Sequence, residues 1–237
     1  MFNADAHIEV KVIAGQLPVL VVDDALLNPH AFVQMAVKHR ELFCYSPLNA
    51  YPGVGVTLPD AITAEMNQWL LTTVRRYLPF RRIVESYTRL TMVTLPPEKL
   101  QPRQWLCHRD RPQQPVNQGV LASVLYLFRN EALGGTNFFL PKQQGEPLAR
   151  MIHDSGQMSA PEFSERYGFR PGYLSESNHW FEKVLNVPAR WNRLIIYDGN
   201  IFHCGDIRST NALSDDPEQG RLTFNGFFTC RKTLSGT

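Results

Sequence analysis

The sequence predicts a mainly β protein with flanking helices (α+β), whose core is a jelly-roll (cupin-like) double sheet. Two observations lead to this fold class. Between residues 83 and 230, short runs of β-branched and aromatic residues alternate with turns rich in Pro, Gly and Asn, which is typical of antiparallel strands. Before residue 83, apolar residues recur at helical spacing in two segments, so we expect two helices beside the sheet.

The composition is that of one globular domain, which we expect to span residues 1–237. Hydrophobic residues make up 43% of the chain, and the net charge of +2 gives no reason to expect nucleic acid or a membrane as partner. The four cysteines contain no CxxC pair, which favours reduced thiols in a cytoplasm. The N-terminus lacks the basic and apolar regions of a signal peptide. We therefore expect a cytoplasmic protein.

Residues 1–82 should supply an N-terminal strand and the supporting helices. The apolar, β-branched run at 17–22 predicts a buried strand. Asn28-Pro29 predicts the start of a helix that runs to about residue 39, and Pro59-Asp60 predicts the start of another at 59–77. The Pro-, Gly- and Tyr-rich stretch at 46–58 between them is expected to be a loop.

Residues 83–230 should form the jelly-roll core, for a total of about eight strands in the chain. Strands are expected at 83–95, 120–128, 136–140, 193–197, 201–204 and 221–230. Asp198-Gly199-Asn200 predicts a hairpin-type turn, and a polar loop covers 209–220. Residues 141–188 are expected to be an insertion, with a helix at 178–185.

The motif Cys107-His108-Arg109-Asp110 is the centre of the functional hypothesis. In an extended strand, alternate side chains share a face, so His108 and Asp110 point the same way while Cys107 points to the other side. An imidazole and a carboxylate so placed can bind one divalent cation. A second imidazole, for which His203 is the candidate, would complete a two-His, one-carboxylate triad that suits non-haem Fe(II).

The order of the motifs resembles that of the Fe(II)/2-oxoglutarate-dependent dioxygenases, and most of all their prolyl-hydroxylase-like branch. The resemblance covers residues 87–228. It rests on the order in which six features occur along the chain. These are the His-x-Asp motif at 108–110, a strand with a tyrosine (122–128), a strand that starts with Gly-Gly (134–138), the Asp-Gly-Asn turn, the strand with His203 and the strand that starts with Arg221. It implies a double-stranded β-helix that uses Fe(II), 2-oxoglutarate as co-substrate and O₂.

The resemblance also implies a role for each matching residue. The catalytic and iron-binding residues would be His108, Asp110 and His203. The residues that bind 2-oxoglutarate would be Arg221, for the distal carboxylate, with Thr223 and Tyr126 assisting it. Arg208 is an alternative that lies nearer to the last histidine. We prefer Arg221 because an apolar strand follows it, whereas a loop follows Arg208.

The expected reaction is hydroxylation of an unactivated C–H bond in a small molecule, amino acid or peptide, with release of succinate and CO₂. Phe128 and Thr136 stand where the prolyl-hydroxylase branch usually has Asn and often has Glu, which weakens the case for a prolyl substrate. The segments 46–58, 101–105 and 141–188 are expected to form the rim of the site and to decide what enters. Substrate identity and oligomeric state are not predicted.

Three alternatives remain open at this stage. The first is a non-catalytic, metal-binding cupin-like protein, in which Cys107 and Cys204 join the histidines at zinc. The second is a β-sandwich binding module with an accidental His-x-Asp. The third is a nucleic-acid demethylase that grips its substrate with Arg103, Arg109, Arg111 and Trp105. The near-neutral charge argues against this third alternative.

Overall fold

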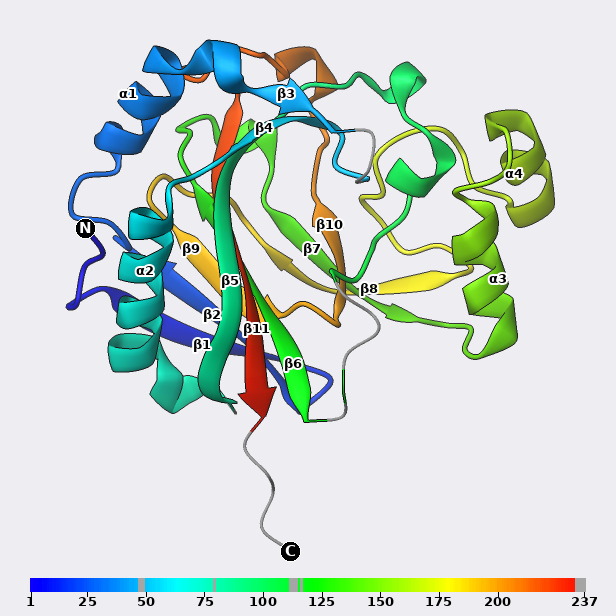
Figure 1. Cartoon of the computed structure of the whole chain (residues 1–237). Helices are drawn as coiled ribbons and strands as arrows, with labels where there is room; N and C mark the ends of the chain where they lie inside the picture. Colours follow the sequence, from blue (N-terminus) through cyan, green and yellow to red (C-terminus); the bar gives the residue numbers. More distant parts are fainter. Residues whose placement is uncertain (47–49, 79, 111–114, 116, 233–237) are drawn as a thin grey trace, which may run out of the picture.

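Two antiparallel sheets form the structure, a computed structural model that describes residues 1–46, 50–78, 80–110, 115 and 117–232 (Figure 1). The large sheet has the order β1-β2-β9-β6-β11-β5-β4-β3, and the small sheet has the order β10-β7-β8. The large-sheet strands are β1 (His7–Ile13), β2 (Leu17–Asp23), β3 (Cys44–Tyr45), β4 (Gly53–Thr57), β5 (Phe80–Val93), β6 (Gln118–Tyr126), β9 (Leu194–Asp198) and β11 (Arg221–Lys232). The small-sheet strands are β7 (Thr136–Pro141), β8 (Phe181–Val187) and β10 (Phe202–Gly205). The predicted mainly β, jelly-roll-like fold is confirmed.

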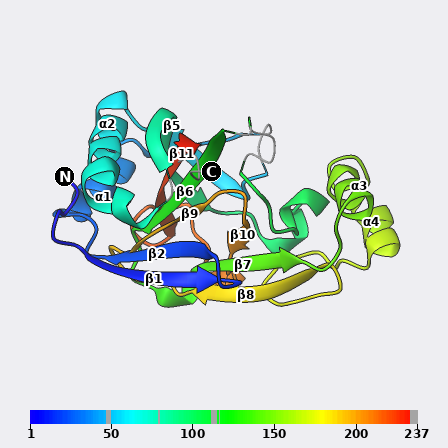
Figure 2. The ribbon, with the colours of Figure 1, turned by 90° about the horizontal axis from the view of Figure 1, so that it is seen from below.

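Two pairs of helices lie at different places on this frame. The bounds are α1 (His30–Lys38), α2 (Asp60–Trp69), α3 (Glu146–Asp154) and α4 (Ala160–Tyr167), and α2 continues as a π-helix (Leu70–Val74) and a 3₁₀ turn (Arg75–Tyr77). Helices α1 and α2 cover the outer face of the large sheet, whereas α3 and α4 lie beyond the far end of the small sheet (Figure 2). No helix in the described part of the chain combines the length and apolarity that a bilayer crossing needs.

Strand alternation divides the apolar side chains among three cores. On β9, Leu194 and Ile196 face the core under α1 and α2, while Ile195 and Tyr197 face the core between the two sheets. A third core packs the small sheet against α3 and α4, with Phe139 contributed by β7. Because each sheet buries both faces over much of its length, the strands read as nearly continuous apolar runs in the sequence.

The expected helix at residues 178–185 is wrong. Residues Phe181–Val187 form β8, which pairs with β7 at the edge of the small sheet, and Asn186 donates to the side chain of Asn137 across that pair at 2.7 Å. The segment contains residues with good helix propensity, but pairing with β7 and burial of both ends of the strand override that preference. The helices of the insertion are instead α3 and α4.

The stretch expected to be a loop at 46–58 contains β4, which pairs with β5. The strand has the sequence Gly-Val-Gly-Val-Thr, in which two glycines weaken the β-strand pattern. Gly53 is required there, since a Cβ atom at this position would lie 1.9 Å from the carbonyl oxygen of Met92. The edge strand β1 was also not predicted. Its Val10 and Val12 are exposed, so the strand lacks the buried run that marks β2.

Candidate metal centre and active site

The structure brings His108, Asp110 and His203 together at one end of the small sheet. His203 lies on β10, and His108 pairs with it through two backbone hydrogen bonds of 3.0 and 2.9 Å. The extended backbone assumed for the His-x-Asp motif is therefore limited to this single bridge. The amide of Asp110 donates to the carbonyl of Gly199 at 2.8 Å, which fixes the third side chain beside the other two.

The donor atoms of this group face one another. Oδ1 of Asp110 lies 3.6 Å from Nε2 of His108, and Oδ2 of Asp110 lies 3.6 Å from Nε2 of His203. One ligand atom from each of the three residues can be chosen so that all three lie within 4.8 Å of one another. Atoms bound to one ion at about 2.1 Å lie about 3 to 4 Å apart, so the spacing fits a shared cation. Asp110 Oδ2 is buried and accepts no hydrogen bond from any described residue. A bound cation would satisfy it.

His203 is oriented for metal binding by its other ring nitrogen. Nδ1 lies 2.8 Å from the carbonyl oxygen of Ile201, and donation along this contact leaves the Nε2 lone pair facing Asp110. Burial lowers the pKa of His203 to about 4, although the Asp110 carboxylate opposes this shift. The imidazole is therefore neutral at pH 7, as a metal ligand must be. Tyr197 packs against the ring with a centroid distance of 4.7 Å.

Asp110 stays ionised although it is buried. Burial alone would raise its pKa, but in the acid range where this carboxyl titrates the charged imidazole of His203, the neighbouring His108 and, to a smaller extent, Arg89 outweigh burial and lower the pKa below its ordinary value. The side chain of Asp110 is 8% exposed and that of His108 is 51% exposed. The carboxylate thus lies on the inner side of the group, and His108 faces the opening.

The turn at residues 198–200 leaves room for the carboxylate. A Cβ atom on Gly199 would lie 2.9 Å from Asp110 Oδ2 and 3.0 Å from Val120, so only glycine fits without displacing a neighbour. This turn was predicted as a hairpin. It instead carries the chain from β9 in the large sheet to β10 in the small sheet, and it delivers His203 to the space between the sheets.

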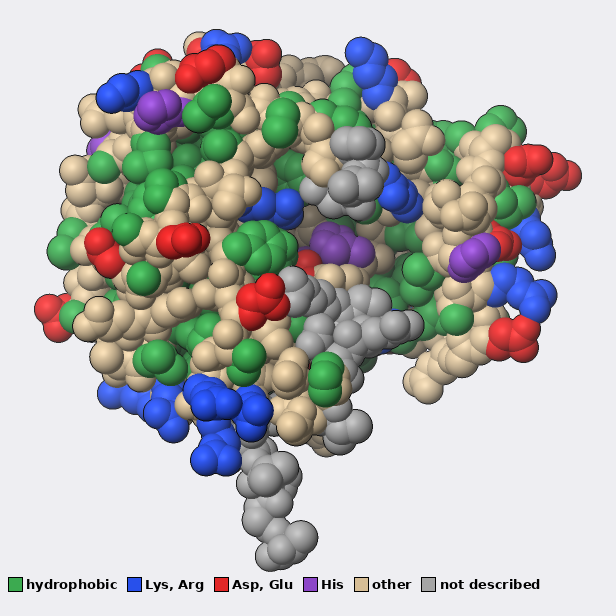
Figure 3. Space-filling view, viewed as in Figure 1, with side chains coloured by type: hydrophobic (Ala, Val, Ile, Leu, Met, Phe, Trp, Pro, Cys, Tyr) green, Lys and Arg blue, Asp and Glu red, His purple; other side chains and the backbone are tan. Residues whose placement is uncertain are grey.

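A cavity of about 440 Å³ opens beside this group, and His108, Asp110 and Arg221 line it. In Figure 3, histidine lies at the base of a hollow with Lys or Arg side chains on either side. Each segment that the sequence assigns to the rim contributes to the lining, for example through Tyr51, Arg103 and Tyr173. Residues 47–49 of the first segment lie outside the described residues.

Arg221, the first residue of β11, is buried in the wall of the same cavity. Its Nε donates to the carbonyls of Leu133 and Gly134, both at 3.1 Å, and its Nη2 donates to that of Gly135 at 2.8 Å. Phe128, which departs from the resembled pattern, places its ring 5.6 Å from the guanidinium carbon. These contacts hold the guanidinium in one orientation.

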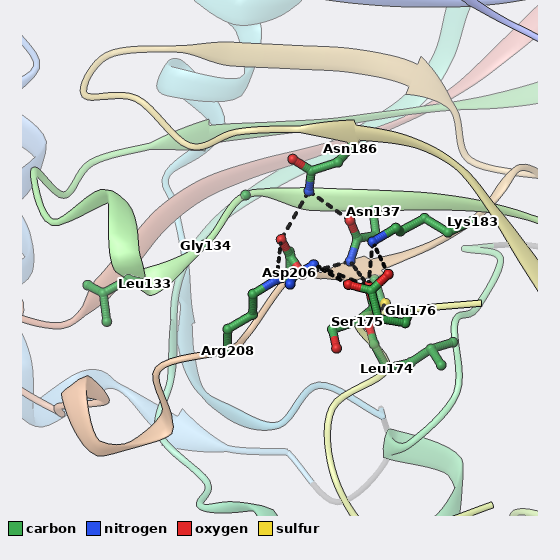
Figure 4. Close-up of polar contacts among 12 residues, drawn as sticks. Leu133, Gly134, Asn137, Leu174, Ser175, Glu176, Lys183, Asn186, Asp206 and Arg208 are labelled. Atoms are coloured by element: carbon green, nitrogen blue, oxygen red, sulfur yellow. Dashed lines mark hydrogen bonds and ion pairs between the residues drawn. The ribbon is translucent and has the colours of Figure 1, made fainter. Parts of the chain in front are cut away.

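Arg208, the alternative anchor, is engaged elsewhere. It forms ion pairs with Asp206 at 3.0 Å and with Glu176 at 2.7 Å, and its side chain is 53% exposed. Figure 4 shows this network, in which Asn137 and Asn186 also donate to Asp206. Arg208 is not among the residues that line the cavity. Of the two arginines, Arg221 alone shares the cavity with the three candidate ligands.

Tyr126 and Thr223 lie near Arg221 but not on the cavity wall. The hydroxyl of Tyr126 is hydrogen-bonded to that of Thr136 at 2.9 Å, and the hydroxyl of Thr223 is hydrogen-bonded to that of Thr91 at 3.0 Å. Neither side chain lines the cavity as the structure stands. Their assisting roles at 2-oxoglutarate remain predictions.

Two of the alternative sites receive no support from the described residues. Cys107 is buried in the third core, Cys204 donates to the carbonyl of Leu174 at 3.2 Å, and neither belongs to a group of three potential metal ligands in the described ranges. Trp105 is 2% exposed and donates to a backbone carbonyl, so it cannot stack on a base. Arg111 lies outside the described residues.

Sequence reasoning missed two parts of the site. Arg89 on β5 lines the cavity, and the Ile201 carbonyl orients His203. Nothing in the sequence distinguishes Arg89 from other strand arginines until the strand register is known. A backbone carbonyl carries no sequence signal at all.

Several solved structures are similar to this chain in fold. SnoK, a non-heme alpha ketoglutarate dependent carbocyclase from nogalamycin biosynthesis, matches with 14% identity over 92% of this chain and 83% of its own, with a TM-score of 0.51. A prolyl-4-hydroxylase from Pseudomonas putida matches with 13% identity over 91% and 92% of the two chains, with a TM-score of 0.47. HygX from Streptomyces hygroscopicus, solved with nickel and 2-oxoglutarate, matches with 12% identity over 91% and 83%, also with a TM-score of 0.47.

The likeness to SnoK concerns the fold alone, because the identity is low. A comparison with curated proteins finds no match. A protein-family profile does match, over residues 4–228, and its description is "Family of unknown function (DUF6445)". Since this match covers nearly the whole chain, the protein belongs to the DUF6445 family.

Proposed function

We propose that this protein is an Fe(II)- and 2-oxoglutarate-dependent dioxygenase that hydroxylates a C–H bond of a small molecule, amino acid or peptide. One observation carries the proposal. The buried, unpartnered Oδ2 of Asp110 faces His203 in a group of three donors, and that group shares a cavity with the buried Arg221. Two imidazoles and one carboxylate leave coordination positions open for a co-substrate and O₂.

The residues have distinct tasks in this proposal. His108, Asp110 and His203 hold Fe(II), and Arg221 holds the distal carboxylate of 2-oxoglutarate. Iron with 2-oxoglutarate and O₂ supplies the oxidising power, with succinate and CO₂ as products. The carbonyls at 133–135 fix the Nε and Nη2 of Arg221, while no described residue accepts a hydrogen bond from Nη1, so donors remain for a carboxylate.

Succinate formation tests the proposal directly. The protein with Fe(II), ascorbate and 2-oxoglutarate should release succinate, slowly alone and faster with a substrate found among free amino acids, peptides and small metabolites. His108→Ala should reduce this rate to background. Arg221→Gln should raise the KM for 2-oxoglutarate by about tenfold or more, because a charge-assisted pair is lost.

The absence of any succinate, even without substrate, would contradict the oxygenase proposal. If the same protein still bound Fe(II) or Zn(II) through His108, Asp110 and His203, the result would instead support a non-catalytic metal-binding protein of cupin-like fold. The metal titration is therefore run beside the turnover assay on each variant.

A further inference from the structure

Arg89 is a second arginine on the inner face of the large sheet. It lies on β5 opposite Asn225 of β11, and its side chain lines the cavity beside His108 and Asp110. The ring of Phe227 lies 5.0 Å from the guanidinium carbon, and that of Tyr51 lies 5.5 Å from it. These rings come from opposite flanks of β5, since β11 and β4 are its two neighbours and Tyr51 just precedes β4.

This guanidinium has no hydrogen-bond acceptor among the described residues. Its Nε is buried and donates to no described residue, and no carboxylate of the described ranges lies within ion-pair distance of it. Arg221, in the same cavity, has both Nε and Nη2 satisfied by backbone carbonyls. A buried cationic donor without an acceptor is costly, and a ligand oxygen would remove that cost.

The charge of the cavity lining favours an anion. Arg103 and Arg109 line it in addition to the two arginines above, and its lining carboxylates are those of Glu85 and Asp110. Asp110 is committed to the metal in the proposed function. The cavity therefore carries an excess of positive charge, although the whole chain has a net charge of only +2.

We propose that Arg89 binds the carboxylate of the primary substrate, which makes that substrate a small organic acid. The assignment rests on the proposed function, in which Arg221 holds 2-oxoglutarate. Arg221 pairs with Val93 of β5, four residues from Arg89, so a strand rise of about 3.3 Å per residue separates the two positions by about 13 Å. A guanidinium flanked by aromatic rings presents its edge, and that edge matches the two oxygens of a carboxylate.

Matched pairs of acids and amides test this assignment by direct binding. Phenylacetate, hexanoate and N-acetylglycine are each titrated calorimetrically against their primary amides, on protein with Mn(II) and 2-oxoglutarate present and again without them. In the wild type at least one acid should bind about tenfold tighter than its amide. Arg89→Gln should reduce that preference to within about twofold, and Arg89→Lys should keep part of it because the charge remains.

The matched control is Arg129→Gln. Arg129 is also placed over an aromatic ring, that of Trp191 at 4.5 Å, but it is exposed and outside the cavity lining. This variant should keep the full preference for acids. Thermal unfolding of each variant shows whether it is folded, and Arg89→Lys provides a second folded test if Arg89→Gln is unstable.

Two results would overturn the assignment. One is a wild type without preference for any acid, or with a preference that Arg89→Gln leaves intact. The other is an Arg89→Gln variant that keeps the preference for acids but shows a roughly tenfold rise in the KM for 2-oxoglutarate. In that case Arg89 would bind a carboxylate of the co-substrate and not one of the substrate. Failure of the proposed function is a separate result, since it appears as absence of succinate, whereas probe binding is measured without turnover.

Discussion

The two faces of β11 differ in chemistry over residues 221–225, although one strand of twelve residues forms both. Leu222 and Phe224 point outward and join the core under α1 and α2. Arg221, Thr223 and Asn225 point inward and are buried as well, but every one of them is polar. The outer face is satisfied by packing alone, whereas the inner face needs a specific partner for each polar group.

This difference separates stability from function within one strand. Asn225 donates to Thr91 at 2.7 Å and the hydroxyls of Thr91 and Thr223 pair at 3.0 Å, so the middle of the inner face is self-sufficient. At the cavity, Asp110 Oδ2 and Arg89 Nε are left without partners among the described residues. Both atoms lie where a ligand is expected, whereas Oδ1 of Asn67, which is also without a partner among the described residues, lies on α2 outside the cavity lining, and no such atom of the described chain belongs to the outer face of β11.

The largest expected effect is that of His203→Ala on the inner side. Loss of one of three donors should reduce Fe(II)-dependent succinate formation by about a thousandfold, to background, with the fold retained. Metal-dependent thermal stabilisation should also disappear. His153→Ala is the control, because His153 is exposed on α3, and it should behave as wild type. Substantial turnover by His203→Ala would remove the metal assignment.

Phe224→Ala should have the opposite profile. Phe224 is fully buried and contacts the rings of Phe2 and Phe32, so its removal should lower the free energy of unfolding by about 3 to 5 kcal/mol. The folded fraction should keep its KM for 2-oxoglutarate. Urea unfolding measures the loss, and Val84→Ala, at an exposed position of β5, should cost less than about 0.5 kcal/mol. An equal effect on KM would mean that the two faces are not independent.

Gly199→Ala sharpens the comparison at the turn between the sheets. The added methyl group would crowd Asp110 Oδ2, so we expect metal affinity to fall by about tenfold while the midpoint of thermal unfolding without metal changes little. Calorimetric titration with Mn(II) measures the affinity. Gly156→Ala is the matched control, because its nearest contact would be an ordinary 3.5 Å. An unchanged affinity would show that the carboxylate can move aside.

The smallest effect concerns an ion pair at the end of β2, outside the cavity lining. Arg193 binds both oxygens of Asp23, at 2.7 and 2.9 Å, and this hydrogen bonding lowers the pKa of Asp23 although burial opposes it. The stabilisation is present above the ordinary pKa of Asp and is lost as pH falls through the lowered folded-state pKa. Asp23→Asn should therefore cost about 1 kcal/mol at pH 7 and progressively less as the pH falls below the ordinary pKa of Asp. A constant cost across this range would contradict the pairing.

Much of the fold follows from local pattern. The runs at 193–197 and 221–230 are apolar and β-branched, so β9 and β11 are found where they were predicted. β8 was missed because its residues suit a helix and only its partner β7 makes it a strand. α4, in contrast, has a local signal, since Ser159 and Glu162 form a capping box at its start.

The sequence predicted which three side chains converge and which segments line the cavity, but not how the other side chains around the candidate site are directed. His-x-Asp depends on residue spacing, which survives folding, and the structure joins it to His203. The inward direction of Arg89 depends on strand register, which is set by pairing with β4 and β11 and not by nearby sequence. For the same reason the sequence favours Arg221 over Arg208 as the anchor for 2-oxoglutarate but does not show which of the two side chains points into the cavity.

The network around Asp206 has a consequence for engineering. Asp206 accepts hydrogen bonds from Asn137 and Asn186 of the small sheet, and Arg208 links it to Glu176. The chain that carries Tyr173 and Leu174 into the cavity wall is thus tied to the small sheet by polar contacts, in addition to its packing against the core that includes α3 and α4. Substitutions in this polar network should therefore alter the shape of the pocket, and with it the choice of substrate, although none of its side chains lines the cavity.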